Sequence, residues 1–294
     1  MQRAAVDLRS LPVFVIAHNR LTYLKRLLSW FEAAGVGNVN IIDNASTYPP
    51  LLDYLRACPH VVHRMPRNFG HLVLWESGSF DTIISKQSFL LSDCDILPVD
   101  ECPSDVIDHL FEVLERYPNF TKVGLSLKID DLPDCYALKS CVLEWERPFW
   151  EHSLEPGLYE AAIDTTFAVY RPGIPPSDLR WWRSIRTAPP YAARHLTWYV
   201  NTSMPSEEDI FYQTNVREMS SHWSVTDPVL LKDQNTKLRL EVTRLRDELE
   251  AFRQGRAAQT SVGSARKFAA AALESVLLLG VARRLKRFVM GNRK

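Results

Sequence analysis

Short apolar runs alternate with helical patterns over the first hundred residues of the chain. The apolar runs are residues 13–17, 39–42, 61–62 and 89–91. After the first run, apolar side chains recur at the i, i+3, i+4, i+7 spacing of one helical face: Leu24, Leu27, Leu28 and Phe31. Strands with little internal alternation, separated by helices, predict a mostly parallel sheet flanked by helices on both faces.

Polar residues follow three of these predicted strands directly. They are His18-Asn19-Arg20, Asp43-Asn44 and Asp93-Cys94-Asp95. In an open α/β sheet, ligands bind at the carboxyl ends of the strands. The three clusters therefore predict a binding site along one edge of the sheet. Further strands are predicted at residues 123–129 and 163–170.

The pattern changes after residue 228. Apolar side chains recur every seven residues at Leu231, Leu238, Leu245 and Phe252, with charged residues between them. We expect a domain at residues 1–228, a coiled coil at 229–253 that makes the chain a homo-oligomer, a linker at 254–264 and an amphipathic tail at 265–294. A single helix packed on the body is the alternative to the coiled coil.

The tail is strongly basic although the whole chain is neutral. Lysine and arginine total 35, as do aspartate and glutamate, so a nucleic-acid partner is not expected. Residues 263–294 hold eight basic side chains and one acidic side chain, a net of +7, which leaves −7 for the rest. A basic amphipathic helix at a membrane surface fits this tail, and a tail docked on its own protein is the alternative. The N-terminus has no secretory pattern, which predicts a cytoplasmic protein peripheral to the inner face of the cell membrane.

The Asp93-Cys94-Asp95 sequence carries the clearest chemistry. Two carboxylates one residue apart at a strand end can hold Mn²⁺ or Mg²⁺ together with a sugar diphosphate. The metal would neutralise the diphosphate as it leaves. A dinucleotide-dependent oxidoreductase is not expected, because the loop after the first strand lacks glycines.

These motifs resemble the nucleotide-sugar glycosyltransferases of the GT-A fold, a Rossmann-like α/β fold, and in particular bacterial family 2. The resemblance covers roughly residues 11–228 and implies donor-binding roles for Ala17, His18, Asn19, Arg20, Asp43, Arg67, Asn68 and Asp93. It implies metal ligation by Asp95 and Asp93, with His222 as the late histidine of the metal shell. The loop at Ala17-His18 departs from the Thr-Tyr of many relatives, and Asp43-Asn44 from a common Asp-Asp.

The resemblance also implies a general base for the acceptor hydroxyl. Glu207-Glu208-Asp209 matches the family's x-Glu-Asp motif, which makes Asp209 the first candidate and Glu208 the second. The same residues are also typical of a helix start, where acids face the helix dipole. Asp164, within the predicted strand at 163–170, is the third candidate.

The sequence therefore predicts an inverting, non-processive and metal-dependent glycosyltransferase. The expected donor is a nucleotide-diphosphate sugar, and the expected acceptor is a glycan or lipid-linked glycan of a cell-surface polysaccharide. The alternative is a catalytically silent GT-A-like module that binds or scaffolds within a membrane-associated glycan assembly complex.

Overall fold

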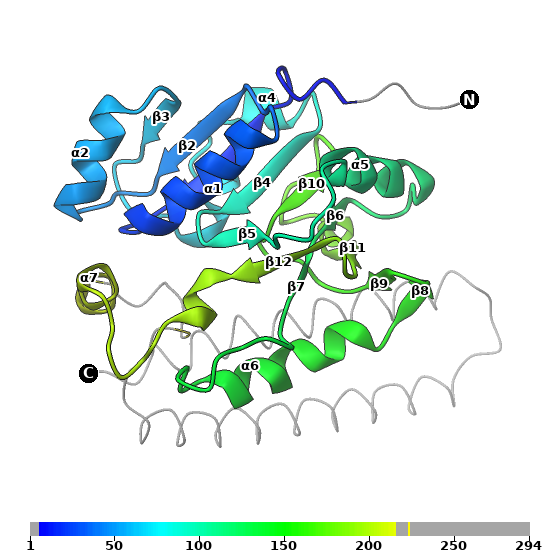
Figure 1. The fold of residues 1–294 in the computed structure, drawn as a ribbon. Coiled ribbons are helices and arrows are strands. Elements are labelled where there is room, and N and C mark those ends of the chain that lie inside the picture. The colour runs from blue at the N-terminus through cyan, green and yellow to red at the C-terminus, as the bar shows by residue number, and fades with distance from the viewer. Residues whose placement is uncertain (1–5, 216–222, 224–294) are drawn as a thin grey trace, which may run out of the picture. The chain divides into compact units, whose positions relative to one another are not determined.

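The computed structural model describes residues 6–215 and residue 223 of the 294-residue chain (Figure 1). The predicted coiled coil, linker and basic tail, at residues 229–253, 254–264 and 265–294, lie outside the described residues, as does His222. The described part is a mixed α/β structure with a nine-stranded sheet and a three-stranded sheet. None of its helices is long and apolar enough to cross a bilayer.

The first four strands of the large sheet run parallel, in the spatial order β3-β2-β1-β4. They are β1 (Val13–Ala17), β2 (Val39–Asp43), β3 (Val61–Arg64) and β4 (Phe89–Asp93). Both central strands, β1 and β4, have neighbours on either side, and β1 is buried along its whole length. This burial explains the apolar runs, and the parallel sheet predicted for the first hundred residues is confirmed.

The other five strands of the large sheet are short and mixed in direction. They are β6 (Lys122–Gly124), β8 (Ser153–Glu155), β9 (Leu158–Glu160), β10 (Ala168–Tyr170) and β11 (Ser184–Thr187). β10 runs antiparallel to both β4 and β6, and β9 runs antiparallel to β8 and β11. The expectation of a mostly parallel sheet is wrong for this half, because parallel neighbours need long crossovers and tight connections such as the β8–β9 hairpin replace them here.

Two predicted strands are shorter than expected. The strand predicted at 123–129 breaks after Gly124, where the chain leaves the large sheet and enters the small sheet. A Cβ on Gly124 would lie 2.7 Å from the Cβ of Ala168, so glycine permits the close approach of β6 and β10. The strand predicted at 163–170 begins only at Ala168, and the loop before it carries Asp164.

The small sheet has the order β5-β12-β7. Its strands are β5 (Ile96–Pro98), β7 (Ser126–Leu127) and β12 (Ala192–His195). β5 follows the Asp93-Cys94-Asp95 sequence immediately, and β12 runs antiparallel to it with His195 opposite Ile96. This pairing brings the end of β12 beside Asp95.

Helices cover the large sheet, and the last of them returns to the loop after β1. The α-helices are α1 (Leu21–Ala33), α2 (Pro49–Ala57), α3 (Val73–Glu76), α4 (Asp81–Ile84), α5 (Val106–Arg116), α6 (Lys139–Glu146) and α7 (Glu207–Asn215). Short 3₁₀ turns are η1 (Gly70–Leu72), η2 (Arg147–Trp150), η3 (Leu179–Trp182) and η4 (Leu196–Tyr199). Figure 1 shows α1 lying across the parallel strands, and the four apolar side chains predicted for its inner face are all buried. α5 contacts β6 and β10.

One charged side chain lies fully inside the core. Lys122 on β6 is 0% exposed, and its Nζ has no hydrogen-bond partner among the described residues. The Nζ lies 3.0 Å from the ring centroid of Trp181 and 5.3 Å from that of Tyr170. A desolvated cation–π contact contributes about 2 kcal/mol, whereas burial of a charge costs several. Burial therefore dominates and holds the pKa of Lys122 well below its usual value, against the opposing attraction of Asp164.

We expect Lys122→Met to raise the free energy of unfolding at pH 7 by about 1–3 kcal/mol, because methionine fills a similar volume without a polar group to desolvate. The lowered pKa means that the unfolded wild-type chain binds a proton at Lys122 that the folded chain does not bind. Wild-type stability therefore rises as the pH approaches the usual lysine pKa of about 10.4. Guanidinium unfolding at pH 7 and pH 9 measures this effect. The difference in free energy of unfolding between variant and wild type should be smaller at pH 9 than at pH 7, and a larger difference at pH 9 would contradict the lowered pKa of Lys122.

Candidate functional site

The parallel strands bring the three predicted polar clusters to one edge of the sheet. Ala17 at the end of β1 lies opposite Asp43 at the end of β2, and Ile16 lies opposite Asp93 at the end of β4. The loops that follow these strands therefore meet at their carboxyl ends. This is the edge at which open α/β sheets bind ligands.

The loop after β1 is held by Asn19. Its backbone N–H donates to the Ser46 hydroxyl at 3.1 Å, and its side-chain Oδ1 accepts from the N–H groups of Thr47 and Tyr48 at 2.7 and 2.9 Å. Asn19 has φ 53°, a left-handed conformation that asparagine tolerates, and it is fully buried. His18 beside it is half-buried, and its Nδ1 lies 2.9 Å from the Asn44 carbonyl oxygen. Asn19 thus joins two loops, and His18 is the more accessible of the pair.

The loop after β2 is held in a similar way. Asp43 is 1% exposed and its Oδ1 accepts from the Ser46 N–H at 2.8 Å. Asn44 donates through Nδ2 to the Asn68 Oδ1 and to the Gly70 carbonyl, both at 2.9 Å. Among the predicted donor-binding residues, Asp43 is therefore buried, Asn68 is half-buried and Arg67 is exposed.

The two carboxylates of Asp93-Cys94-Asp95 have different partners. Asp93 accepts the Thr165 hydroxyl at 2.6 Å through Oδ2, and its backbone N–H donates to the Thr165 carbonyl at 2.9 Å. Asp95 faces His195, with 3.3 Å between Oδ2 and Nε2. Burial opposes the charge on Asp95, but the His195 imidazole outweighs it and holds the pKa of this carboxyl below its usual value. Both partners lie far along the sequence and only the fold joins them.

His195 is the site residue that sequence reasoning missed. It ends β12 and lies opposite Ile96, while the N–H of Leu196 donates to the Asp95 carbonyl at 2.7 Å. The ring of Trp198 packs edge-on against the imidazole, with 4.7 Å between centroids. No sequence motif links Asp95 with a histidine one hundred residues later. The one local signal for His195 is its position at the end of a strand, β12.

The carboxylate of Glu208 acts on the start of α1. Its Oε2 accepts from the N–H groups of Leu21 and Thr22 at 3.1 and 3.0 Å, and from the Thr22 hydroxyl at 3.1 Å. A helix begins with unpaired N–H groups and a positive dipole end, and the N-cap residue Arg20 makes no side-chain cap. Glu208 supplies the missing cap from the other end of the domain, where α7 begins.

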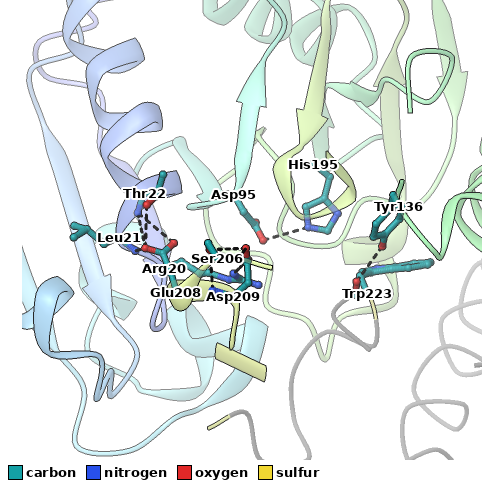
Figure 2. Close-up of polar contacts among 10 residues, drawn as sticks. All are labelled: Arg20, Leu21, Thr22, Asp95, Tyr136, His195, Ser206, Glu208, Asp209 and Trp223. Atoms are coloured by element: carbon teal, nitrogen blue, oxygen red, sulfur yellow. Dashed lines mark hydrogen bonds and ion pairs between the residues drawn. The ribbon is translucent and has the colours of Figure 1, made fainter. Parts of the chain in front are cut away.

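Asp209 forms a buried ion pair with Arg20. The side chains are 8% and 3% exposed, and the Asp209 Oδ2 also accepts the Ser206 hydroxyl at 2.6 Å. The Arg20 guanidinium lies over the Tyr212 ring, 3.8 Å from its centroid. Figure 2 shows Asp95 lying between this ion pair on one side and His195 on the other. Both acids of the x-Glu-Asp motif thus bind α7 to the loop after β1.

Asp164, the third candidate base, has a different environment. Its side chain is 55% exposed, and its Oδ1 lies 3.4 Å from the Nε2 of His71. It is therefore the most accessible of the three predicted catalytic carboxylates, since Glu208 and Asp209 are both buried.

Two of the three predicted metal ligands, Asp93 and Asp95, lie among the described residues. Residues 6–215 and residue 223 contain no group of three or more His, Cys, Asp and Glu side chains placed to hold a metal ion. His222 lies outside the described residues. Trp223, the next residue, packs 5.8 Å from the Trp198 ring, and the Tyr136 hydroxyl donates to its carbonyl at 3.0 Å.

Comparisons with known proteins find similar chains among the solved structures. No family model and no curated protein matches the chain. The chain is similar to glucosyl-3-phosphoglycerate synthase from Mycobacterium tuberculosis, solved with phosphoglyceric acid, with 14% identity and a TM-score of 0.36 over 58% of this chain and 62% of that chain. The chain thus spans less than two thirds of that synthase. It is also similar to apo UDP-glucose pyrophosphorylase, with 9% identity and a TM-score of 0.34 over 70% of this chain and 100% of that chain.

Removal of the Glu208 carboxylate should loosen α1 from α7. We expect Glu208→Ala to lower the free energy of unfolding by about 1–2 kcal/mol, the cost of losing a helix cap. The exposed neighbour Glu207 provides the matched control, and Glu207→Ala should stay within about 0.5 kcal/mol of wild type. Denaturant unfolding of both variants measures the difference, and equal losses would show that Glu208 does not act as the cap.

Proposed function

We propose that the chain is a metal-dependent glycosyltransferase that moves a sugar from a nucleotide-diphosphate sugar to a glycan or lipid-linked acceptor. The observation that carries the proposal is the position of Asp95. It lies at the carboxyl end of the parallel strands, faces His195 and adjoins the loop after β1. A carboxylate and an imidazole at such an edge suit a divalent ion that also contacts phosphate oxygens.

Asp95 and His195 would hold Mn²⁺ or Mg²⁺. Such ions need only one or two protein carboxylates when substrate phosphates and waters complete the shell, so the pair fits the metal although the described residues offer no third ligand. When bound, the ion neutralises the diphosphate leaving group. Asp93 is held by Thr165, which favours a supporting role for it. His222 remains a proposed ligand on the grounds of its sequence alone.

The donor would lie along the loops after β1, β2 and β3. His18, Arg67 and Asn68 retain exposed surface there. Arg20, Asn19 and Asp43 are buried and hold the loops, so their proposed contribution to donor binding is to fix the shape of the site. Ala17 ends β1 and contributes backbone.

The acceptor hydroxyl must lose its proton as its oxygen attacks the anomeric carbon. Asp209, Glu208 and Asp164 are the proposed bases. The oxygens of Asp209 and Glu208 are buried and already accept hydrogen bonds within the protein, so they are poorly placed to contact an acceptor hydroxyl. This argument favours Asp164 over the other two. Inversion at the anomeric carbon, a single transfer per encounter and a role in cell-surface polysaccharide synthesis belong to the same proposal.

The partners proposed for residues 229–294 rest on sequence alone. They are a second copy of the chain through the coiled coil and a membrane surface through the basic tail. A location at the inner face of the cell membrane is proposed from that basic tail.

A catalytically silent binding module is the second candidate. The observation in its favour is that two of the three candidate bases, Glu208 and Asp209, attach α7 to the loop after β1 and the start of α1. Such a module would bind a nucleotide sugar without consuming it.

The test is a panel of UDP-, GDP-, dTDP- and CMP-sugars, each with and without Mn²⁺, measured for thermal stabilisation and for hydrolysis. A donor at about 100 times its Kd should stabilise the wild type by about 2.7 kcal/mol. Asp95→Asn should lose the part of this stabilisation that depends on Mn²⁺. Asp100→Asn, which changes a carboxylate 92% exposed beside Arg194, should keep it. Stabilisation without turnover would favour the silent module, and no response to any donor would overturn the nucleotide-sugar proposal.

A further inference from the structure

His71 and Asp164 form a pair at the edge where the donor is proposed to bind. The imidazole Nε2 lies 3.4 Å from the carboxylate Oδ1, and the two side chains are 28% and 55% exposed. Neither residue belongs to a motif that sequence reasoning joins to the other. The pair therefore arises from the fold alone, and its partial exposure leaves it open to a substrate.

His71 is held in place from the β2 side of the edge. It lies in η1, directly after Gly70, whose carbonyl accepts from the Asn44 side chain at 2.9 Å. Asn44 follows the last residue of β2. Gly70 has φ 75°, a left-handed turn conformation that glycine adopts without strain. The turn thus holds His71 next to the loop that follows β2.

Asp164 is held from the β4 side. The next residue, Thr165, exchanges two hydrogen bonds with Asp93, one through its hydroxyl at 2.6 Å and one through its carbonyl at 2.9 Å. The Tyr170 hydroxyl donates to the Asp164 carbonyl at 2.9 Å. The backbone of Asp164 is therefore fixed while its side chain stays exposed. The pair therefore joins the segment held by Asn44, after β2, to the segment held by Asp93, at the end of β4.

The partner of Asp164 differs in kind from the partners of the other carboxylates. Arg20 is a permanent cation that neutralises Asp209, whereas the His71 imidazole, 3.4 Å from the Asp164 Oδ1, is charged only when protonated. A neutral neighbour at this distance can limit the orientations of a carboxylate without neutralising its charge. Asp164 also keeps its second oxygen, Oδ2, which the contact with His71 does not use.

We propose that Asp164 is the general base that accepts the proton of the acceptor hydroxyl, and that His71 is the positioning residue that orients its carboxylate. This inference rests on the proposed glycosyltransferase function. In the step, the acceptor oxygen forms a bond to the anomeric carbon while the bond from that carbon to the diphosphate oxygen breaks. The electron pair leaves with the nucleoside diphosphate, and the hydroxyl proton passes to the Asp164 carboxylate.

Other charged groups face this pair from the neighbouring strands. Lys122 on β6 lies close enough to Asp164 for the carboxylate to favour the charged form of the lysine, although burial outweighs this effect. Asp93 on β4 accepts the hydroxyl of Thr165, the residue after Asp164. Tyr170 on β10 contacts the backbone of Asp164.

The first experiment uses the full chain and whichever nucleotide sugar of the panel stabilises the wild type. Donor binding is followed by thermal shift and turnover by release of the nucleoside diphosphate, with water as acceptor. Asp164→Asn should keep the donor-induced stabilisation and lose about 100-fold or more of turnover, the usual contribution of a general base. His152→Gln, at an exposed histidine, and Asp100→Asn should leave both unchanged.

The second experiment replaces His71 by glutamine or by asparagine, because the amide nitrogen of each can take the place of one ring nitrogen. The amide nitrogen of glutamine overlays Nε2, the atom that faces Asp164, whereas that of asparagine overlays Nδ1. His71→Gln should therefore retain most of the turnover. His71→Asn should lose about tenfold, because the carboxylate is no longer oriented. A merely structural histidine would not separate these two variants.

Each outcome decides between the pair and the wider function. Donor binding with full turnover in Asp164→Asn, or equal turnover in the two His71 variants, overturns the role of the pair and leaves the glycosyltransferase intact. Absence of donor binding in the wild type overturns the proposed function and the catalytic role together. The NMR chemical shifts of the His71 ring then still test the contact itself, because Asp164→Asn should change them if the two side chains are adjacent.

Discussion

The attachment of α7 to the loop after β1 is the interaction on which the site depends. Arg20 and Asp209 form a buried ion pair, and Glu208 caps the N-terminus of α1 beside it. Loss of one partner of a buried pair leaves an uncompensated charge, which costs about 3–5 kcal/mol. The last helix of the described domain is thereby joined to its first loop, and the orientation of α1 against the sheet depends on a residue 186 positions away.

This attachment divides the edge of the sheet into a rigid side and an open side. On the rigid side Asn19, Asp43 and Asp209 are buried and their polar atoms are engaged within the protein. Such groups can shape a site, but their donors and acceptors are not available to a ligand. On the open side Asp164 keeps exposed carboxylate surface. The groups at this edge that a ligand can reach are therefore the exposed ones, such as the Asp164 carboxylate.

Much of the parallel half of the fold could be predicted, whereas the second half could not. Fully buried strands give continuous apolar runs, and the inner face of α1 gives a 3.6-residue repeat, so both are visible in the sequence. The strand predicted at 163–170 is mostly loop, because ladder pairing with β4 and β6 begins only at Ala168. Before it, Thr165 contacts β4 at Asp93 alone, once through its hydroxyl and once through its carbonyl. Short strands in mixed directions leave too few residues for a pattern, and their pairing depends on contacts such as that between Gly124 and Ala168.

The sequence by itself determined the strands of the parallel half and the meeting of three polar clusters at one edge, because local periodicity and the direction of parallel strands decide both. It also supplied Asp93 and Asp95 as a recognisable pair. Only the tertiary structure decided what each side chain does there. His195 beside Asp95, Glu208 on α1 and His71 beside Asp164 are contacts across 93 or more residues. Such contacts depend on how the strands are ordered and on which buried polar groups must find a partner, and no local pattern records either.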